Sequence, residues 1–229
     1  MLPIKYIQKT CLIDFPGKVS CVVFLGGCNF RCGFCHNPDL VENKIPDISE
    51  QEVFDFLEKR KKWIDGVVIS GGEPLLYDEI SSFVEKIKKM GYLIKIDTNG
   101  TNPRLLKRLI DKNLVDYIAM DIKNSLDKYK ETVEAEVNLD DIKKSVELIK
   151  NSSLDYEFRT TIVPSLHTKE DIERIGTWLK GAKKFVIQNF RPKNCLDKEF
   201  EKKKSFSKEI LEEFKAIVSK FIDNVEIRD

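Results

Sequence analysis

Three cysteines stand close together near the amino terminus of this 229-residue chain. Cys28, Cys32 and Cys35 lie within the stretch "GGCNFRCGFCHN" and have the spacing C-x-x-x-C-x-x-C. A disulfide uses two thiols. An odd number in one short segment therefore indicates a metal ion, or an iron–sulfur cluster with one coordination site left open.

Ligand spacing distinguishes the candidate metal groups. A structural zinc site takes four protein ligands, often as two C-x-x-C pairs, and this chain has no second pair. His36 is the remaining candidate for a fourth zinc ligand, but it directly follows Cys35, and adjacent side chains rarely point at one ion. Three thiolates that hold three irons of a [4Fe–4S] cluster agree better with the spacing, and zinc is kept as the alternative.

Composition limits the classes of function. Lysine and arginine total 39 against 38 acidic residues, so the net charge of +1 gives no general attraction to nucleic acid or to an anionic membrane. The first residues, "MLPIKYIQKTC", lack the basic and apolar regions of a secretory signal. We expect a cytoplasmic protein without nucleic-acid or membrane partners, in a compartment where clustered cysteines are more often ligands than disulfides.

Short apolar runs alternate with amphipathic helical patterns, which is typical of βα units around a parallel sheet. One helix is predicted to begin at Ser49, with Glu52 completing a capping box and Trp63 on the buried stripe. The pattern predicts a single domain, residues 1–229, with "VEIRD" as a candidate terminal strand. The six predicted strands span residues 19–25, 66–70, 92–97, 117–122, 156–163 and 185–190.

Six βα units predict an incomplete (β/α)6 barrel of parallel strands, because about eight such units are needed for closure. Chemistry in parallel βα folds lies on the loops that follow the carboxyl ends of the strands. Each predicted strand has polar residues there, in the cysteine loop and in "SGGEP", "DTNG", "MDIK", "RTTIVP" and "QNFRP". Each motif is weak alone, but together they predict one site at one mouth of the barrel.

The stretch "CNFRCGFC" followed by "GGEP" resembles the radical S-adenosylmethionine (SAM) superfamily, in motif order over nearly the whole chain. In that superfamily the open iron binds SAM, and one electron splits SAM into methionine and a 5′-deoxyadenosyl radical. Residues 12–41 are also similar to activating proteins of anaerobic ribonucleoside-triphosphate reductase and, more loosely, to pyruvate formate-lyase activating enzyme. The resemblance implies an oxidoreductase that installs a glycyl radical on a partner enzyme and accepts electrons from a flavodoxin or ferredoxin-type donor.

The resemblance also implies roles for individual residues. The three cysteines would hold the cluster, the "GGE" motif and Lys123 would bind the methionine part of SAM, and the "DTN" motif and Asp121 would contact ribose or a monovalent cation. Ordinary core or surface positions are the alternative for each residue outside the cysteine motif. The implied cofactor-binding residues are Phe34, Gly71, Gly72, Glu73, Asp97, Asn99, Asp121, Lys123, Arg159 and Arg191.

The segment "LIDFPGK" precedes the first predicted strand. The resemblance implies that Asp14, Gly17 and Lys18 lie near the cluster and contact the incoming glycine loop of the partner. A tight structural turn is the alternative, because Asp, Pro and Gly are turn formers.

The sequence leaves the roles of Cys195 and of the two histidines undecided. Cations at Arg191 and Lys193 could lower the pKa of the Cys195 thiol, which would favour a redox or partner role over an unreactive loop thiol. His36 either orients the cysteine loop or is exposed. His167 is expected to be a loop residue before a helix and not a ligand.

Two other classes of function remain alternatives. A non-catalytic iron–sulfur or zinc protein does not explain why "GGEP", "DTNG" and "MDIK" accompany the cysteines on successive strands. A radical SAM enzyme that acts on a small molecule or on RNA is harder to exclude, but the chain has no second cysteine set and no basic surplus. Activation of a glycyl-radical enzyme is therefore the favoured prediction.

Overall fold

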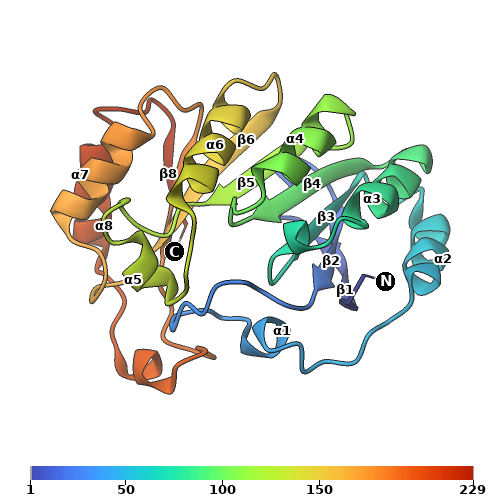
Figure 1. Ribbon diagram of the computed structural model, residues 1–229, viewed down its shortest axis with the longest axis horizontal. Coiled ribbons are helices and arrows are strands. Elements are labelled where there is room, and N and C mark those ends of the chain that lie inside the picture. The colour runs from blue at the N-terminus through green and yellow to red at the C-terminus, as the bar shows by residue number, and fades with distance from the viewer. Residues whose placement is uncertain (1, 229) are drawn as a thin grey trace.

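The computed structural model describes residues 2–228, which contain one eight-stranded sheet with its strands in chain order. The first two strands are antiparallel, and every later pair is parallel. The sheet curves with its helices on the outer face (Figure 1). The strands are β1 (Ile4–Cys11), β2 (Ser20–Leu25), β3 (Gly66–Gly71), β4 (Leu93–Thr98), β5 (Tyr117–Asp121), β6 (Asp155–Ile162), β7 (Phe185–Asn189) and β8 (Val225–Arg228).

The predicted architecture, an incomplete barrel of parallel βα units, is confirmed. β1 and β8 are the two edges of the sheet, so the barrel is open between them. Two 3-10 helices accompany the α-helices, η1 (Pro74–Leu76) and η2 (Lys198–Lys202). The α-helices are α1 (Pro38–Val41), α2 (Glu50–Arg60), α3 (Ile80–Lys89), α4 (Pro103–Asp111), α5 (Tyr129–Val133), α6 (Leu139–Lys150), α7 (Lys169–Trp178) and α8 (Lys208–Val218).

Alternating residues of each strand face two different environments. On β2, Val23 packs in the large cluster between sheet and helices, whereas Val22 packs in a smaller cluster with Phe15, Val68 and Tyr117 on the inner face. The inner face also carries buried polar groups, because Lys95 and Glu157 are each 1% exposed. The helices therefore bury one side of the sheet, and the other side holds the chemistry.

Two element predictions need correction. β1 was not predicted, because its pairing with β2 is interrupted by register shifts and its burial does not alternate regularly. Trp63 is not on a buried stripe: α2 ends at Arg60, and the Trp63 side chain is 70% exposed in the turn that follows. The capping box at Ser49 and Glu52 is present as predicted.

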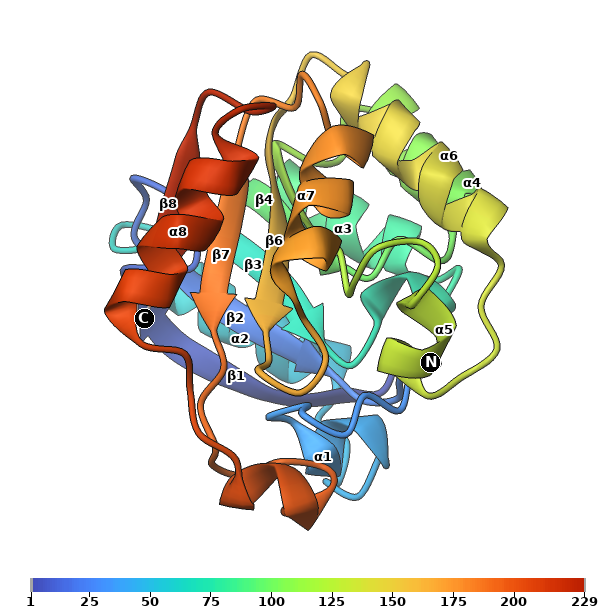
Figure 2. The same ribbon diagram turned by 90° about the vertical axis from the view of Figure 1, so that its left-hand side faces the viewer.

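The carboxyl ends of the parallel strands lie together at one end of the barrel. In Figure 2 the arrowheads of β6 and β7 point toward this end, where α1 and the segment containing η2 lie. Deeper in the barrel, Glu157 accepts two hydrogen bonds from Arg228, at 2.8 and 2.7 Å, and a third from Tyr117 at 3.2 Å. These side chains fill the lumen below the strand ends.

No helix within residues 2–228 is long and apolar enough to cross a membrane.

Candidate active site

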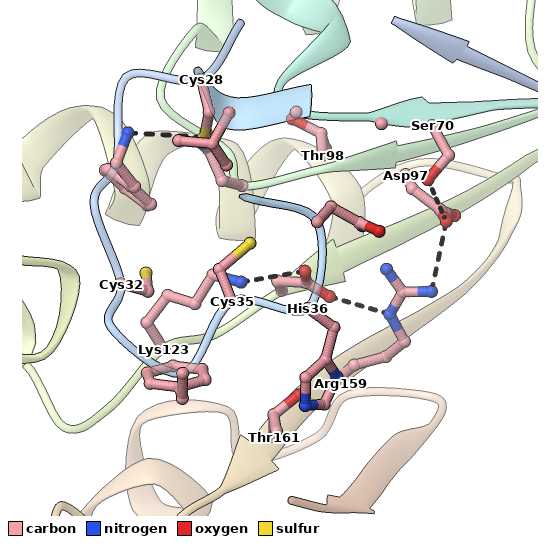
Figure 3. Close-up of a pocket in the computed structure, with 18 of the residues that line it drawn as sticks. Cys28, Cys32, Cys35, His36, Ser70, Asp97, Thr98, Lys123, Arg159 and Thr161 are labelled. Atoms are coloured by element: carbon pink, nitrogen blue, oxygen red, sulfur yellow. Dashed lines mark hydrogen bonds and ion pairs between the residues drawn. The ribbon is translucent and has the colours of Figure 1, made fainter. Parts of the chain in front are cut away.

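A cavity of about 250 Å³ lies at the carboxyl ends of the parallel strands. Figure 3 shows the cysteine loop on one side of it and the ends of the strands across from that loop. The structure thus brings together residues that are up to 160 positions apart in the chain. Those used below are Cys28, Cys32, Cys35, Ser70, Gly71, Gly72, Asp97, Thr98, Asn99, Asp121, Lys123, Arg159, Thr161 and Gln188.

The three predicted ligand cysteines all line this cavity. Burial raises the pKa of the Cys28 thiol to about 11 and that of the Cys32 thiol to about 12. Free thiols with such pKa values are protonated at neutral pH, so metal binding must release protons from them.

The cysteine loop is held on one side by the end of α5. The amide of Arg31 donates a hydrogen bond to the carbonyl of Val133 at 2.8 Å, and the amide of Gly33 donates to the Glu134 carboxylate at 3.2 Å. Glu134 has a left-handed backbone with φ of 49°, which is uncommon outside glycine. These contacts fix the middle of the loop, between the first and last cysteine.

The segment after β7 holds the other side of the loop. The amide of Leu196 donates to the Cys35 carbonyl, and the amide of Asp197 donates to the Gly33 carbonyl, both at 2.9 Å. Phe34 packs against Phe200 with ring centroids 6.1 Å apart and is only 4% exposed. Phe34 is therefore a core residue whose remaining surface faces the cavity.

His36 orients the cysteine loop, and Arg191 takes part through its backbone. The Nε2 of His36 lies 2.8 Å from the Arg191 carbonyl oxygen, and its ring stacks on Phe190. The Arg191 side chain is exposed and does not line the cavity. The expectation that Arg191 is a cation of the rim is wrong, because Arg191 lies beyond the end of β7 at Asn189 and meets the cysteine loop with its backbone and not with its side chain.

Gly71 and Gly72 bring the turn after β3 against the backbone that leads into the cysteine loop. The Gly72 amide donates to the Leu25 carbonyl at 2.9 Å, and a Cβ atom on Gly72 would overlap the carbonyl oxygen of Gly27. Gly71 has φ of +126°, which side chains rarely allow. Only glycine can occupy this place without moving the two loops apart.

Glu73 differs from its expected role. Its carboxylate is 1% exposed, does not line the cavity, and accepts hydrogen bonds from the amides of Leu75 and Asn99 and from the Thr98 hydroxyl at 2.6–2.9 Å. Burial raises the pKa of Glu73, and the three hydrogen bonds lower it. Burial has the larger effect, so the pKa is about 7. Glu73 therefore fixes the loop that carries Asn99 and does not itself face a ligand.

Five charged side chains form a continuous chain across the strand ends. Lys95 and Asp97 are 2.6 Å apart, Arg159 lies 3.4 Å from Asp97 and 2.8 Å from Asp121, and Lys123 lies 3.0 Å from Asp121. Burial by itself raises the pKa of both acids, but the neighbouring cations, Arg159 above all, hold it below its usual value. Lys95, Arg159 and Lys123 therefore already balance the negative charge of Asp97 and Asp121, which a bound monovalent cation would otherwise balance.

The loop of Asp14, Gly17 and Lys18 lies far from the cavity. Cys11 at the end of β1 pairs with Ser20 at the start of β2, so the loop sits at the end of β2 opposite to the cysteine loop. The Cys11 thiol donates to the Asp14 carboxylate at 2.8 Å. The expectation that this loop adjoins the cluster is wrong, because a whole strand separates the two.

Cys195 is fully buried, and its pKa is raised by burial. The hypothesis of a reactive, low-pKa thiol is therefore wrong. His167 is also buried, just before α7, where its Nδ1 accepts from the Val163 amide and its Nε2 lies 2.9 Å from the Lys123 carbonyl oxygen. His167 thus supports the backbone of a cavity residue.

Ser70, Thr161 and Gln188 are among the cavity residues that were not predicted from the sequence. Ser70 donates to Asp97 at 3.1 Å, while Thr161 and Gln188 line the cavity from β6 and from β7. Each of them lies two positions along its strand from another inward-facing residue, or is in register with an inward-facing residue of the neighbouring strand. That alternation is the signal that could have identified them, once the inner face was known.

The sequence profile described as "Radical SAM superfamily" matches residues 22–179, which hold the cysteine loop and four of the cavity-lining strands. The chain belongs to the radical SAM superfamily. Within it, the chain belongs to the family of glycyl-radical enzyme activating enzymes, as the relatives below show.

A protein of Methanocaldococcus jannaschii that carries the name glycyl-radical enzyme activating enzyme is 40% identical over 94% of this chain and 91% of its own. The pyruvate formate-lyase-activating enzyme of Clostridium pasteurianum is 32% identical over 77% of this chain and 76% of its own. Among solved structures, Streptococcus suis SuiB bound to precursor peptide SuiA has a TM-score of 0.69 at 16% identity, and covers 88% of this chain and 46% of that one. This last likeness concerns the fold.

Radical SAM enzymes use a [4Fe–4S] cluster and SAM, and the cavity has donors suited to both. No three His, Cys, Asp or Glu side chains within residues 2–228 are arranged to hold one metal ion. A cluster differs, because each thiolate binds its own iron and the donors need not converge on one point. Cys28, Cys32 and Cys35 would hold the cluster, and the backbone of Gly71 and Gly72 borders the same cavity.

Proposed function

We propose that this protein activates anaerobic ribonucleoside-triphosphate reductase by generating a glycyl radical on it. The observation that carries the proposal is the combination, in one cavity, of three thiols, a glycine pair and a set of paired charges, in a chain that aligns over most of its length with glycyl-radical activating enzymes. Similarity of residues 12–41 to activators of that reductase supports this partner.

The charges of the cavity suit the methionine part of SAM. The carbonyl groups of the Gly71–Gly72 turn would accept hydrogen bonds from the ammonium group, and Lys123 would pair with the carboxylate. Asp121 holds the Lys123 ammonium at 3.0 Å, and His167 holds the Lys123 backbone. Asp97 and Asn99 would contact the ribose hydroxyls.

When bound, the cluster supplies the one electron that splits SAM into methionine and a 5′-deoxyadenosyl radical, which takes a hydrogen atom from a glycine of the partner. The electron comes from an external reductant, for which a flavodoxin or ferredoxin-type protein is proposed. This chain contributes the binding of SAM, its orientation, and the exclusion of water by the filled lumen beneath it.

A second candidate partner is pyruvate formate-lyase, because relatives named as its activating enzymes are 32–38% identical to this chain over parts of it. The test is to mix the anaerobically reconstituted protein with SAM, dithionite and each candidate enzyme from the same organism. Electron paramagnetic resonance then measures the glycyl radical. A radical on the reductase supports the proposal, a radical only on the lyase replaces the partner, and no radical on either overturns the function.

A further inference from the structure

Two polar side chains stand apart from the paired groups of the cavity. Thr161 and Gln188 are half-buried, line the cavity and, within residues 2–228, form no side-chain hydrogen bond with another residue. By contrast, Ser70, Thr98 and Asn99 all have protein partners. Partly buried polar groups usually find a partner, so these two are available to a ligand.

These two residues are neighbours on the inner face of the sheet. Thr161 lies near the end of β6, and the ladder pairs it with Gln188 of β7. Parallel-sheet partners in register lie side by side. The pair therefore forms one small polar wall, which we call the neutral wall and define as Thr161 and Gln188.

The neutral wall is separate from the part of the cavity that suits SAM. Gly71, Asp97 and Asn99 belong to β3, β4 and the loop after β4, and Lys123 follows β5, whereas the wall lies on β6 and β7. Arg159, two positions before Thr161 on β6, pairs with Asp97 and Asp121 on the side of the wall that faces these groups. β7 adjoins the edge strand β8, next to the opening of the barrel. Figure 2 shows β7 and β8 at this side of the fold.

The chemistry of the wall matches a polypeptide backbone. The Gln188 amide offers one acceptor and two donors, and the Thr161 hydroxyl offers both functions, which are the groups that a peptide unit needs. Neither residue carries a charge, so the wall has no feature that selects a charged group. We propose that Thr161 and Gln188 bind the main chain beside the target glycine of the partner; this inference rests on the proposed function.

Near-isosteric variants test the wall. Gln188→Leu and Thr161→Val remove the hydrogen-bonding groups and keep the approximate volume. Thr160→Val is the matched control, because Thr160 is 1% exposed and its hydroxyl has no partner. The probe is a short synthetic peptide that spans the glycine of the anaerobic reductase. Each wall variant should raise the KM for this peptide about 2- to 10-fold, whereas Thr160→Val should not change it.

A chemical change in the probe identifies the contacted group. N-methylation of a peptide bond beside the glycine removes one main-chain donor. For a bond that contacts Gln188, methylation should raise the KM of the wild-type protein severalfold and have little further effect in Gln188→Leu. Additive effects for every methylated position would overturn the contact.

The affinity for SAM separates this inference from the proposed function. Calorimetric titration of SAM into the reconstituted protein should show a smaller change in Kd than the change in peptide KM. An equal loss of SAM affinity would assign the wall to SAM and overturn the inference. Wild-type KM values in both wall variants would also overturn it, while radical formation by the wild type would still support the function. Failure of the wild type to form a radical on any partner or peptide would overturn both.

Discussion

The guanidinium of Arg159 lies 2.8 Å from the carboxylate of Asp121, and this ion pair joins β6 to β5 at the floor of the cavity. Arg159 also reaches the Asp97 carboxylate at 3.4 Å and is mostly buried. Replacement by an uncharged residue would leave Asp97 and Asp121, both largely buried, without their shared cation and with one lysine partner each. Removing one partner from a largely buried set of ion pairs is costly.

We expect Arg159→Leu to lower the free energy of unfolding of the cluster-free protein by about 3–5 kcal/mol. Urea denaturation followed by circular dichroism measures the change. Arg174→Leu is the control, because its ion pair with Asp127 is exposed and contributes little. Equal stability of the Arg159 variant and the control would show that the buried pair is not stabilising the sheet.

Replacement of Cys28, Cys32 or Cys35 by alanine should remove the cluster, because each iron loses an anionic sulfur ligand. Iron and labile sulfide are assayed after anaerobic reconstitution. Cys195→Ala is the matched control, since Cys195 is a fully buried thiol near the same loop and should leave the iron content unchanged. A full cluster in all three ligand variants would refute the assignment.

Glu73 should give the protein a specific pH dependence. Its pKa in the fold is about 7 and its ordinary value is 4.5, so its contribution to stability is complete below pH 4.5 and is lost as pH rises through 7. The shift corresponds to about 3 kcal/mol. Glu73→Gln should lack this fall, which is measured as the difference between the two stability curves from pH 4 to 8. Parallel curves would mean that the carboxylate is already ionised at pH 4.5.

Asp14 lies at the end of β2 opposite to the cysteine loop, where it accepts a hydrogen bond from Cys11. We therefore expect Asp14→Ala to keep wild-type iron content, SAM cleavage and radical formation on the glycine peptide. The same assays as above measure all three. A selective loss of radical formation would show that the partner chain extends to this end of the barrel.

The cluster motif and the βα alternation could be predicted from the sequence because both depend on local spacing. Three cysteines within eight residues share one loop in any fold, and apolar runs between amphipathic stretches predict parallel strands whose carboxyl ends meet. Gly71, Asp97, Asp121 and Arg159 follow from that rule. Their strands could be placed without knowledge of any long-range contact.

The direction of each side chain was decided by the tertiary structure. Glu73 turns inward because donors from the next strand's loop satisfy its carboxylate, and Arg191 turns outward because its strand has already ended. Asp14 lies at the end of the barrel opposite to the cysteine loop because β1 pairs antiparallel with β2. The sequence pattern did not predict β1. Gln188 faces the cavity because alternate residues of β7 point to the inner face of the sheet, and Gln188 is one of them. These outcomes depend on pairing between distant segments, which local spacing does not encode.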